Sequence, residues 1–407
     1  MARGLGTPFW LLYCGESTSA IGTTASAVAL PITALRITGD VRQAGLAGTA
    51  VAVGVVAARL PGGVIADRRP ARGLLLVANL LGAVVLGTVA LLLQRNAVSV
   101  PVLLTAGLLL GTIPSFLAPV ENVALRTFVQ RNLLPRALAL IQTRMAAATV
   151  AGPLAGGALL AVAPAWVFTA DACTYLAACV CMALLPRRDR PQATAEHPLR
   201  SAAEGIRFVW RSPFLRYAAV NATVLNLVFN GLLILVVAAA GTHGGSIGVG
   251  VQMAALGGGA LAGSAVAVPV ARRLPPARGI AAATALVAAV LLGFSGARTE
   301  WLAAGLLALA AATGPVVTVV VTTLQMAITP PELQGRVHSG IGFLAQAVAP
   351  VGPLLAGLSA HALGFTPTVV CAAFAVAAVA LVGGIVVSRQ APGPPTPSDS
   401  PLRSGRG

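Results

Sequence analysis

Twelve apolar stretches, each long enough to cross a bilayer, constrain this chain more than any other feature. A membrane-spanning helix needs about 20 consecutive, mostly apolar residues. Only 9% of the 407 residues are charged, against about 25% in a typical soluble domain. We therefore predict an all-α polytopic membrane protein with twelve transmembrane helices. The stretches fall at Phe9–Leu35, Ala44–Ala66, Gly73–Leu93, Val98–Val120, Ala137–Val162, Ala165–Leu185, Leu215–Ala238, Ile247–Val270, Gly279–Gly296, Trp301–Thr323, Ser339–Ser359 and Thr366–Val387.

A single long polar interval divides these stretches into two sets of six. We predict an N-terminal six-helix bundle over residues 1–186 and a C-terminal bundle over 215–388. Residues 187–214 form the linker between them, and apolar residues at helical spacing from Leu199 to Trp210 predict an amphipathic helix on the membrane surface. Residues 389–407 are rich in Pro, Ser and Gly, so we expect a disordered tail.

The arginines predict how the chain lies in the membrane. The net charge is +16, and the sequence contains no lysine. Cytoplasmic loops carry an excess of Lys and Arg. If the N-terminus is cytoplasmic, 21 of the 27 arginines fall on the inner side, and only Arg36, Arg42, Arg95 and Arg298 fall on the outer side. Both termini are therefore predicted to be cytoplasmic. Arginines scattered over short loops do not indicate a nucleic-acid partner. The high content of Arg, Ala and Gly is typical of a protein from a GC-rich bacterial genome.

The two halves of the chain repeat each other. Arg136 is followed by GPLAGG at Gly152–Gly157, and Arg336 is followed by GPLLAG at Gly352–Gly357. Two such halves predict pseudo-symmetric bundles with a substrate site between them. A Gly-Pro pair removes a backbone donor and lets helices approach closely. We therefore expect hinge or packing roles for Gly152, Pro153, Gly156, Gly157, Gly352 and Pro353.

The stretch GGVIADRRPAR at Gly62–Arg72 resembles the loop between the second and third helices of Major Facilitator Superfamily transporters. The stretches LPITALRITGD, TADACTYL and EGIRFVWRSPFLR extend the resemblance to the branch that includes the enterobactin exporter and actinobacterial drug-efflux-like proteins. The resemblance implies a bacterial plasma-membrane protein whose two bundles rock about a central cavity.

The resemblance also implies a conformational switch in this loop. Gly63 would let the second helix approach the eleventh, and Asp67 would face the positive N-terminal end of the eleventh helix near Ser339. Pro70 and Ala71 replace the expected glycine and basic residue. Arg68, Arg69 or Arg72 is therefore expected to reach Glu121 at the end of the fourth helix.

Glu16 is the leading candidate for chemistry within the membrane. It lies about seven residues, or about 10 Å, into the first span, and Ser19 and Thr23 follow on the same face. A carboxylate inside a span costs about 3 kcal/mol on insertion scales, which makes it a functional candidate. Arg144 lies at the same expected depth on a neighbouring helix. Two roles therefore stay open: Glu16 contacts substrate or protons, or it pairs with Arg144 to hold or gate the helices.

The remaining polar residues of the spans are weaker candidates. Asp171 lies in the sixth span, where we favour a structural role satisfied by neighbouring groups. Asn226 and Asn230 share a face of the seventh span, and Gln346 lies in the eleventh. These amides are candidates for the lining of a cavity or for contacts between helices.

These patterns favour a secondary active transporter, and we expect a proton-coupled exporter of a small amphipathic or hydrophobic compound, such as a drug or secondary metabolite. Uptake of a small metabolite is the alternative, and a non-transporting receptor or structural protein is a third class. The sequence shows no P-loop, no catalytic set and no metal-ligand spacing among its cysteines and histidines. We therefore expect no enzyme activity, no metal and no cofactor beyond the proton gradient. The expected partners are a small-molecule substrate and the lipid bilayer, with the monomer as the working unit.

Overall fold

A computed structural model describes residues 5–186, 207–243, 245–273, 276–329 and 334–390. Within these ranges the regular elements are helices, and twelve helical segments are long and apolar enough to cross a membrane. The predicted number of spans is therefore confirmed. The helices run several residues beyond most of the predicted apolar stretches. The linker residues 187–206 and the tail 391–407 lie outside the described residues, and with them most of the predicted amphipathic helix.

The N-terminal bundle consists of six long helices. A 3₁₀ turn at Arg131–Leu133 precedes the fifth of them. Gly39 ends the first helix with φ of 69°, a left-handed conformation that glycine adopts without strain. Asp40 then caps the second helix by accepting a hydrogen bond from the Arg42 amide. The helices are α1 (Gly6–Thr38), α2 (Val41–Arg68), α3 (Ala71–Gln94), α4 (Val100–Phe128), α5 (Leu134–Val162) and α6 (Pro164–Ala183).

The C-terminal bundle repeats this arrangement with one difference. Its helices are α8 (Pro213–His243), α9 (Gly245–Arg273), α10 (Pro276–Ser295), α11 (Glu300–Ile328), α12 (Gln334–Ala347), α13 (Val351–Leu363) and α14 (Phe365–Gln390). The predicted span Ser339–Ser359 is thus divided between α12 and α13. Pro350 has no amide hydrogen to donate, and short turns from Ala349 to Gln346 and from Val351 to Val348 replace the α-helical bonds there.

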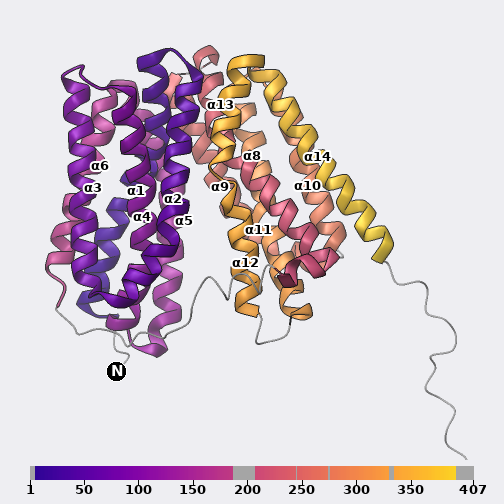
Figure 1. Ribbon diagram of the computed structural model, residues 1–407, viewed down its shortest axis with the longest axis horizontal. Helices are drawn as coiled ribbons and strands as arrows, with labels where there is room; N and C mark the ends of the chain where they lie inside the picture. The colour runs from indigo at the N-terminus through magenta and orange to yellow at the C-terminus, as the bar shows by residue number, and fades with distance from the viewer. Residues whose placement is uncertain (1–4, 187–206, 244, 274–275, 330–333, 391–407) are drawn as a thin grey trace, which may run out of the picture.

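The two bundles meet at the end of the molecule that carries the α1–α2 turn, here called the Asp40 end. Close approaches of glycines join α2 to α13 and α5 to α9. A Cβ at Gly45 would lie 2.8 Å from the Pro353 carbonyl oxygen, and one at Gly250 would lie 2.6 Å from the Pro153 carbonyl oxygen. Figure 1 shows the ribbons of the two bundles in contact at this end and diverging toward the end where the N-terminus lies. The pairing of α2 with α13 and of α5 with α9 is pseudo-symmetric, as the repeated sequence predicts.

Candidate functional site

Glu16 lies in the third turn of α1, inside the N-terminal bundle. Only 7% of its surface is exposed. Its Oε1 accepts a hydrogen bond of 3.3 Å from Nδ2 of Asn79 on α3, and the same amide nitrogen donates to the Leu75 carbonyl at 2.9 Å. Asn79 is fully buried, and its own Oδ1 has no hydrogen-bond partner. The carboxylate is thus held by a neutral amide.

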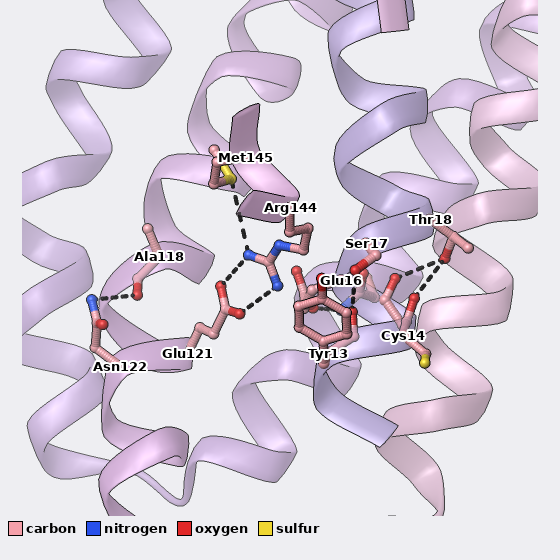
Figure 2. A network of polar contacts seen from close by, with 12 residues as sticks. Tyr13, Cys14, Glu16, Ser17, Thr18, Ala118, Glu121, Asn122, Arg144 and Met145 are labelled. Carbon is pink, nitrogen blue, oxygen red and sulfur yellow. Dashed lines mark hydrogen bonds and ion pairs between the residues drawn. The ribbon is translucent and has the colours of Figure 1, made fainter. Parts of the chain in front are cut away.

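Glu121 on α4 and Arg144 on α5 form a two-pronged ion pair next to Glu16. Nη1 of Arg144 lies 2.6 Å from Oε1 of Glu121, and Nη2 lies 2.8 Å from Oε2. Figure 2 shows this pair beside Glu16, with no hydrogen bond or ion pair drawn between Glu16 and Arg144. Both residues of the pair are more than nine-tenths buried. This geometry, with two parallel bonds, is the strong form of an Arg–carboxylate contact.

The pairing of Glu16 with Arg144, one of the two roles left open for Glu16, is therefore wrong, and so is the contact with Glu121 for Arg72, one of the three arginines considered for it. Arg144 pairs with Glu121 and not with Glu16, because its Nη1 and Nη2 atoms donate to the two carboxylate oxygens of Glu121 on α4. Arg72 does not reach Glu121 either. It donates from Nε to the Met182 carbonyl at 3.3 Å and from Nη2 to the Ala183 carbonyl at 2.6 Å. Arg72 thus binds the last carbonyls of α6, where a cation is favourable.

The rest of the expected switch loop is only partly described. Arg68 is exposed at the end of α2. Gly63 and Asp67 belong to the last turns of α2, but their surroundings, like those of Ser339, lie outside the described side chains. The expected contact between Asp67 and the eleventh helix therefore stays a prediction.

Glu16, Glu121 and Arg144 together form a buried cluster with two carboxylates and one guanidinium. Electrostatic coupling links all three groups. With both acids ionised the cluster would carry one uncompensated negative charge, which a single proton or cation would neutralise. Burying an unpaired charge is costly. The arrangement can therefore hold one exchangeable proton, with Glu16 as the carboxylate that has no guanidinium partner.

Ser19 and Thr23 continue the face of α1 on which Glu16 lies. Ser19 is 3% exposed, and Thr23 Oγ1 donates to the Tyr175 hydroxyl on α6 at 3.0 Å. Asp171 lies one turn before Tyr175 and is fully buried. The Thr174 hydroxyl donates to Oδ1 of Asp171 at 3.1 Å, a neighbouring group of the kind expected for a structural role.

The candidates in the C-terminal bundle lie apart from this cluster. Asn226 and Asn230 are partly buried on α8, and their side-chain amides donate to the Ala222 and Asn226 carbonyls within that helix. Gln346 is partly buried in the last turn of α12. Among the described residues, no recorded contact joins these amides to Glu16 or Arg144. The structure therefore does not assemble all the sequence candidates into one site.

The Gly-Pro motifs hold helices together within and between the bundles. Gly152 and Gly156 press against α1, since a Cβ at Gly156 would lie 2.9 Å from the Ala25 carbonyl oxygen, and Gly352 presses against α8. Gly157 faces the opposite bundle, where a Cβ would lie 3.0 Å from Cα of Gly250. Pro153 and Pro353 supply the backbone that the glycines of the other bundle meet. The repeated motif thus forms tight contacts on both sides of its helix.

Sequence reasoning did not single out Asn79 and Tyr175, although both contact candidate residues. A signal for Asn79 was present, because it is the lone amide in the third span, where Thr88 is the other polar side chain. The contact between Asp40 and His361, which joins the two bundles at the Asp40 end with 3.3 Å between Oδ1 and Nδ1, was also not predicted.

Twelve spanning helices in two like bundles, joined through glycines at one end and carrying buried charges inside one bundle, define a polytopic membrane protein of the transporter class. The family model described as Major Facilitator Superfamily matches residues 12–299. The chain belongs to this superfamily, whose members are membrane transporters and not enzymes.

Two relatives with similar sequences are named as exporters. The chain is 30% identical over 210 residues to the enterobactin exporter EntS of Shigella flexneri, a match that spans about half of each protein. It is 27% identical over 318 residues to EntS of Citrobacter koseri, covering 76% of this chain and 75% of that protein. These relatives and the twelve apolar helices indicate a multi-pass protein of a bacterial inner membrane.

Solved structures share the fold at low identity. A bacterial homologue of the lysosomal transporter Spinster, in an inward-facing and unoccupied conformation, has a TM-score of 0.72 at 15% identity, covering 95% of this chain and 98% of its own. A bacterial homologue of the iron transporter ferroportin, in an inward-facing state, has a TM-score of 0.69 at 14% identity, covering 94% and 99%. At these identities the likeness concerns the fold alone.

Proposed function

We propose that this transporter is a proton-coupled exporter of a small amphipathic or hydrophobic compound, working by alternating access. The observation that carries the proposal is the buried Glu16 carboxylate, which has an amide partner while the nearby guanidinium is bound to Glu121. A carboxylate in this setting can gain and lose a proton without breaking an ion pair. The exporter names of the relatives support the outward direction.

The proposal includes an orientation and a gate. With 21 of the 27 arginines on the side of the N-terminus, that side is cytoplasmic. The bundles meet at the Asp40 end and diverge toward the N-terminus (Figure 1), so this conformation is the inward-facing one. The loop Gly62–Arg72 would then lie at the cytoplasmic side, where Asp67 serves as a latch of the outward-facing form. The working unit is a monomer in lipid, driven by the proton gradient without a bound cofactor.

Transport in proteoliposomes tests this function. Purified protein is reconstituted, a pH gradient is imposed, and the movement of two probes, enterobactin and the lipophilic cation ethidium, is followed. We expect a probe to move against the direction of proton flow, as an antiporter requires. Movement in the same direction as protons would instead support the uptake alternative.

Glu16→Gln is the decisive variant. We expect it to lose stimulation by the pH gradient and to retain exchange of probe between the two sides at equal pH, because the amide preserves the shape of the side chain but holds no exchangeable charge. Glu300→Gln at the start of α11 is the matched control and should behave as the parent protein. Full gradient stimulation in Glu16→Gln would rule out Glu16 as the coupling residue.

A further inference from the structure

A row of polar side chains runs along one face of α1 and faces α6. Its members are Glu16, Ser19, Thr23 and Ser26, spaced at three or four residues as one helix face requires. Glu16, Ser19 and Ser26 are at least nine-tenths buried, and Thr23 is partly buried. Such a row inside an apolar bundle needs polar partners along its length.

Those partners come from α6. Tyr175 is 1% exposed. Its hydroxyl accepts a hydrogen bond from Thr23 and also lies beside the Ser19 hydroxyl. Both Glu16 and Asp171 are close enough to act electrostatically on the Tyr175 hydroxyl. Tyr175 therefore stands between the two buried acids.

Two glycines provide the space for these α6 side chains. A Cβ at Gly22 of α1 would collide with the Asp171 carboxyl, and a Cβ at Gly82 of α3 would lie 2.7 Å from the Tyr175 ring. The two polar side chains of α6 thus fit where the neighbouring helices carry no side chain. Close approach brings Asp171 and Tyr175 directly against the polar row of α1.

The hydrogen bonds around Asp171 give little stabilisation to a charged carboxyl. The Thr174 hydroxyl lies 2.7 Å from the Asp171 backbone carbonyl and 3.1 Å from the Asp171 Oδ1. One hydroxyl hydrogen serves one of these oxygens fully, and the shorter contact is to the carbonyl. Because this one hydrogen is shared between two oxygens, the Asp171 carboxyl accepts only part of a hydrogen bond from Thr174.

The remaining groups near Asp171 lead to the same conclusion. Oδ2 of Asp171 and Oγ of Ser26 are both buried, and neither atom has a hydrogen-bond partner. The Ser26 side chain nevertheless lies near the Asp171 carboxyl. No charged side chain of the described residues acts on Asp171. Tyr175 is the titratable residue one turn further along α6, and Glu16 on α1 acts on the Tyr175 hydroxyl, while α3 contributes the amide of Asn79, which does not titrate.

We infer that Asp171 is a second proton-binding site, which exchanges protons with Glu16 through the hydroxyls of Thr23, Tyr175 and Ser19. This inference rests on the proposed proton coupling and extends it to a residue deeper in the membrane. Each hydroxyl accepts one proton on one side and releases its own on the other, so the hydroxyls are unchanged after a transfer. The proton lost by the Asp171 carboxyl ends on the Glu16 carboxylate, and the reverse transfer restores it.

Infrared difference spectroscopy of the full chain in lipid bilayers tests the inference. A step in pH changes the carbonyl stretching band of every carboxyl that gains or loses a proton. We expect two buried-carboxyl signals in the parent protein, one removed by Asp171→Asn and the other by Glu16→Gln. Glu300→Gln is the control and should leave both signals in place.

Tyr175→Phe and Thr23→Val separate a relay from a merely structural contact. Both should keep the Asp171 signal but slow its response to a pH step about a hundredfold, since a positioned proton-transfer group is typically worth that much. Thr18→Val is the matched control, because Thr18 bonds only to carbonyls of its own helix. An Asp171→Asn spectrum identical to that of the parent, or an equally fast Asp171 response in Tyr175→Phe, would overturn the inference.

The outcome is distinguishable from a failure of the proposed function. Two carboxyl signals in a protein whose transport does not depend on the pH gradient would refute proton coupling of transport. The inference that Glu16 and Asp171 are two linked proton-binding sites would still hold. Gradient-driven transport that depends on Glu16, with no signal from Asp171, would refute this inference alone.

Discussion

Among the residues that the structure describes, a buried side-chain hydrogen bond joins the first and third helices of each bundle, but only one of the two bonds involves an acid. In the N-terminal bundle Asn79 on α3 donates to Glu16 on α1. In the C-terminal bundle Thr284 on α10 donates to Asn221 on α8 at 2.9 Å. The two residues are 63 positions apart in both pairs. The repeat has thus kept the contact and replaced a carboxylate by an amide.

The fourth and fifth helices show the same difference. Helices α4 and α11 are both 29 residues long and begin at Val100 and Glu300. At the positions that match Glu121 and Arg144, the C-terminal bundle has Val321 and Leu344, which pack in one apolar cluster. Packing of the bundle therefore does not require the charges. At these two positions only the N-terminal bundle carries ionisable side chains.

Removing the guanidinium should produce the largest effect. Arg144→Leu gives the N-terminal bundle the residue of the other half but leaves Glu121 buried without its partner. Breaking a buried ion pair costs about 3–5 kcal/mol. We expect a loss of that size in the free energy of unfolding, measured by reversible denaturation in mixed micelles.

The double variant Arg144→Leu with Glu121→Val is the control for this comparison. It copies the apolar pair of the C-terminal bundle, and replacing a whole buried pair by apolar residues is often neutral or stabilising. We expect it to recover most of the lost stability. A double variant as unstable as Arg144→Leu would mean that the two bundles differ in packing as well as in charge.

The two amide contacts provide a smaller and directly matched test. Asn79→Ala removes the only recorded donor to the Glu16 carboxylate among the described residues, and Thr284→Val removes the donor to the Asn221 amide oxygen. An unsatisfied buried group costs about 1–3 kcal/mol, and more when it is charged. We expect Asn79→Ala to be the more destabilising of the two in the same denaturation assay.

Function should separate these two variants more clearly than stability. If Glu16 carries the exchangeable proton as proposed, we expect Asn79→Ala to change the pH dependence of transport and Thr284→Val to leave that dependence unchanged. Equal effects of both variants on the pH profile would show that the neutral contact of the C-terminal bundle takes part in coupling.

The sequence was sufficient for the number of spans and for the helix that carries Glu16. Runs of about 20 apolar residues define spans whatever their neighbours are, and the position of Glu16 along its span follows from a constant rise per residue. The division of one predicted span into α12 and α13 was not predicted. The residues around Pro350 are apolar on both sides, so composition alone does not show the break.

The sequence was not sufficient for the partners of the buried acids. Depth places Glu16 and Arg144 at one level, but the direction in which each side chain leaves its helix depends on the packing of α1, α3, α4 and α5. Arg144 meets Glu121, only 23 positions earlier on the preceding helix, and Glu16 meets an amide 63 positions away. Which side chains pair inside a bundle depends on how each helix is rotated about its own axis. The spacing of apolar residues specifies that rotation only coarsely.

The exposed ion pair between Arg42 and Asp40 tests whether the contribution of an ion pair to stability depends on its burial and not on charge alone. Arg42 donates from Nε to Oδ2 of Asp40 at 2.7 Å, and His361 of the other bundle lies on the Oδ1 side. The side chain of Arg42 is 48% exposed, and exposed pairs contribute little. We therefore expect Asp40→Asn to lower the unfolding temperature less than any variant above.

The pH dependence of that small effect has a defined sign. The hydrogen bond from the Arg42 side chain, with smaller contributions from its amide and from His361, lowers the pKa of Asp40 below the usual 3.8. A lowered folded-state pKa adds stability above the unfolded-state value, and that stability is lost as the pH falls through the folded-state pKa. The difference in unfolding temperature between the parent and Asp40→Asn should therefore be constant near neutral pH and disappear only below 3.8. A difference that changes in the neutral range would contradict this account, because a carboxyl whose pKa lies below 3.8 does not titrate there.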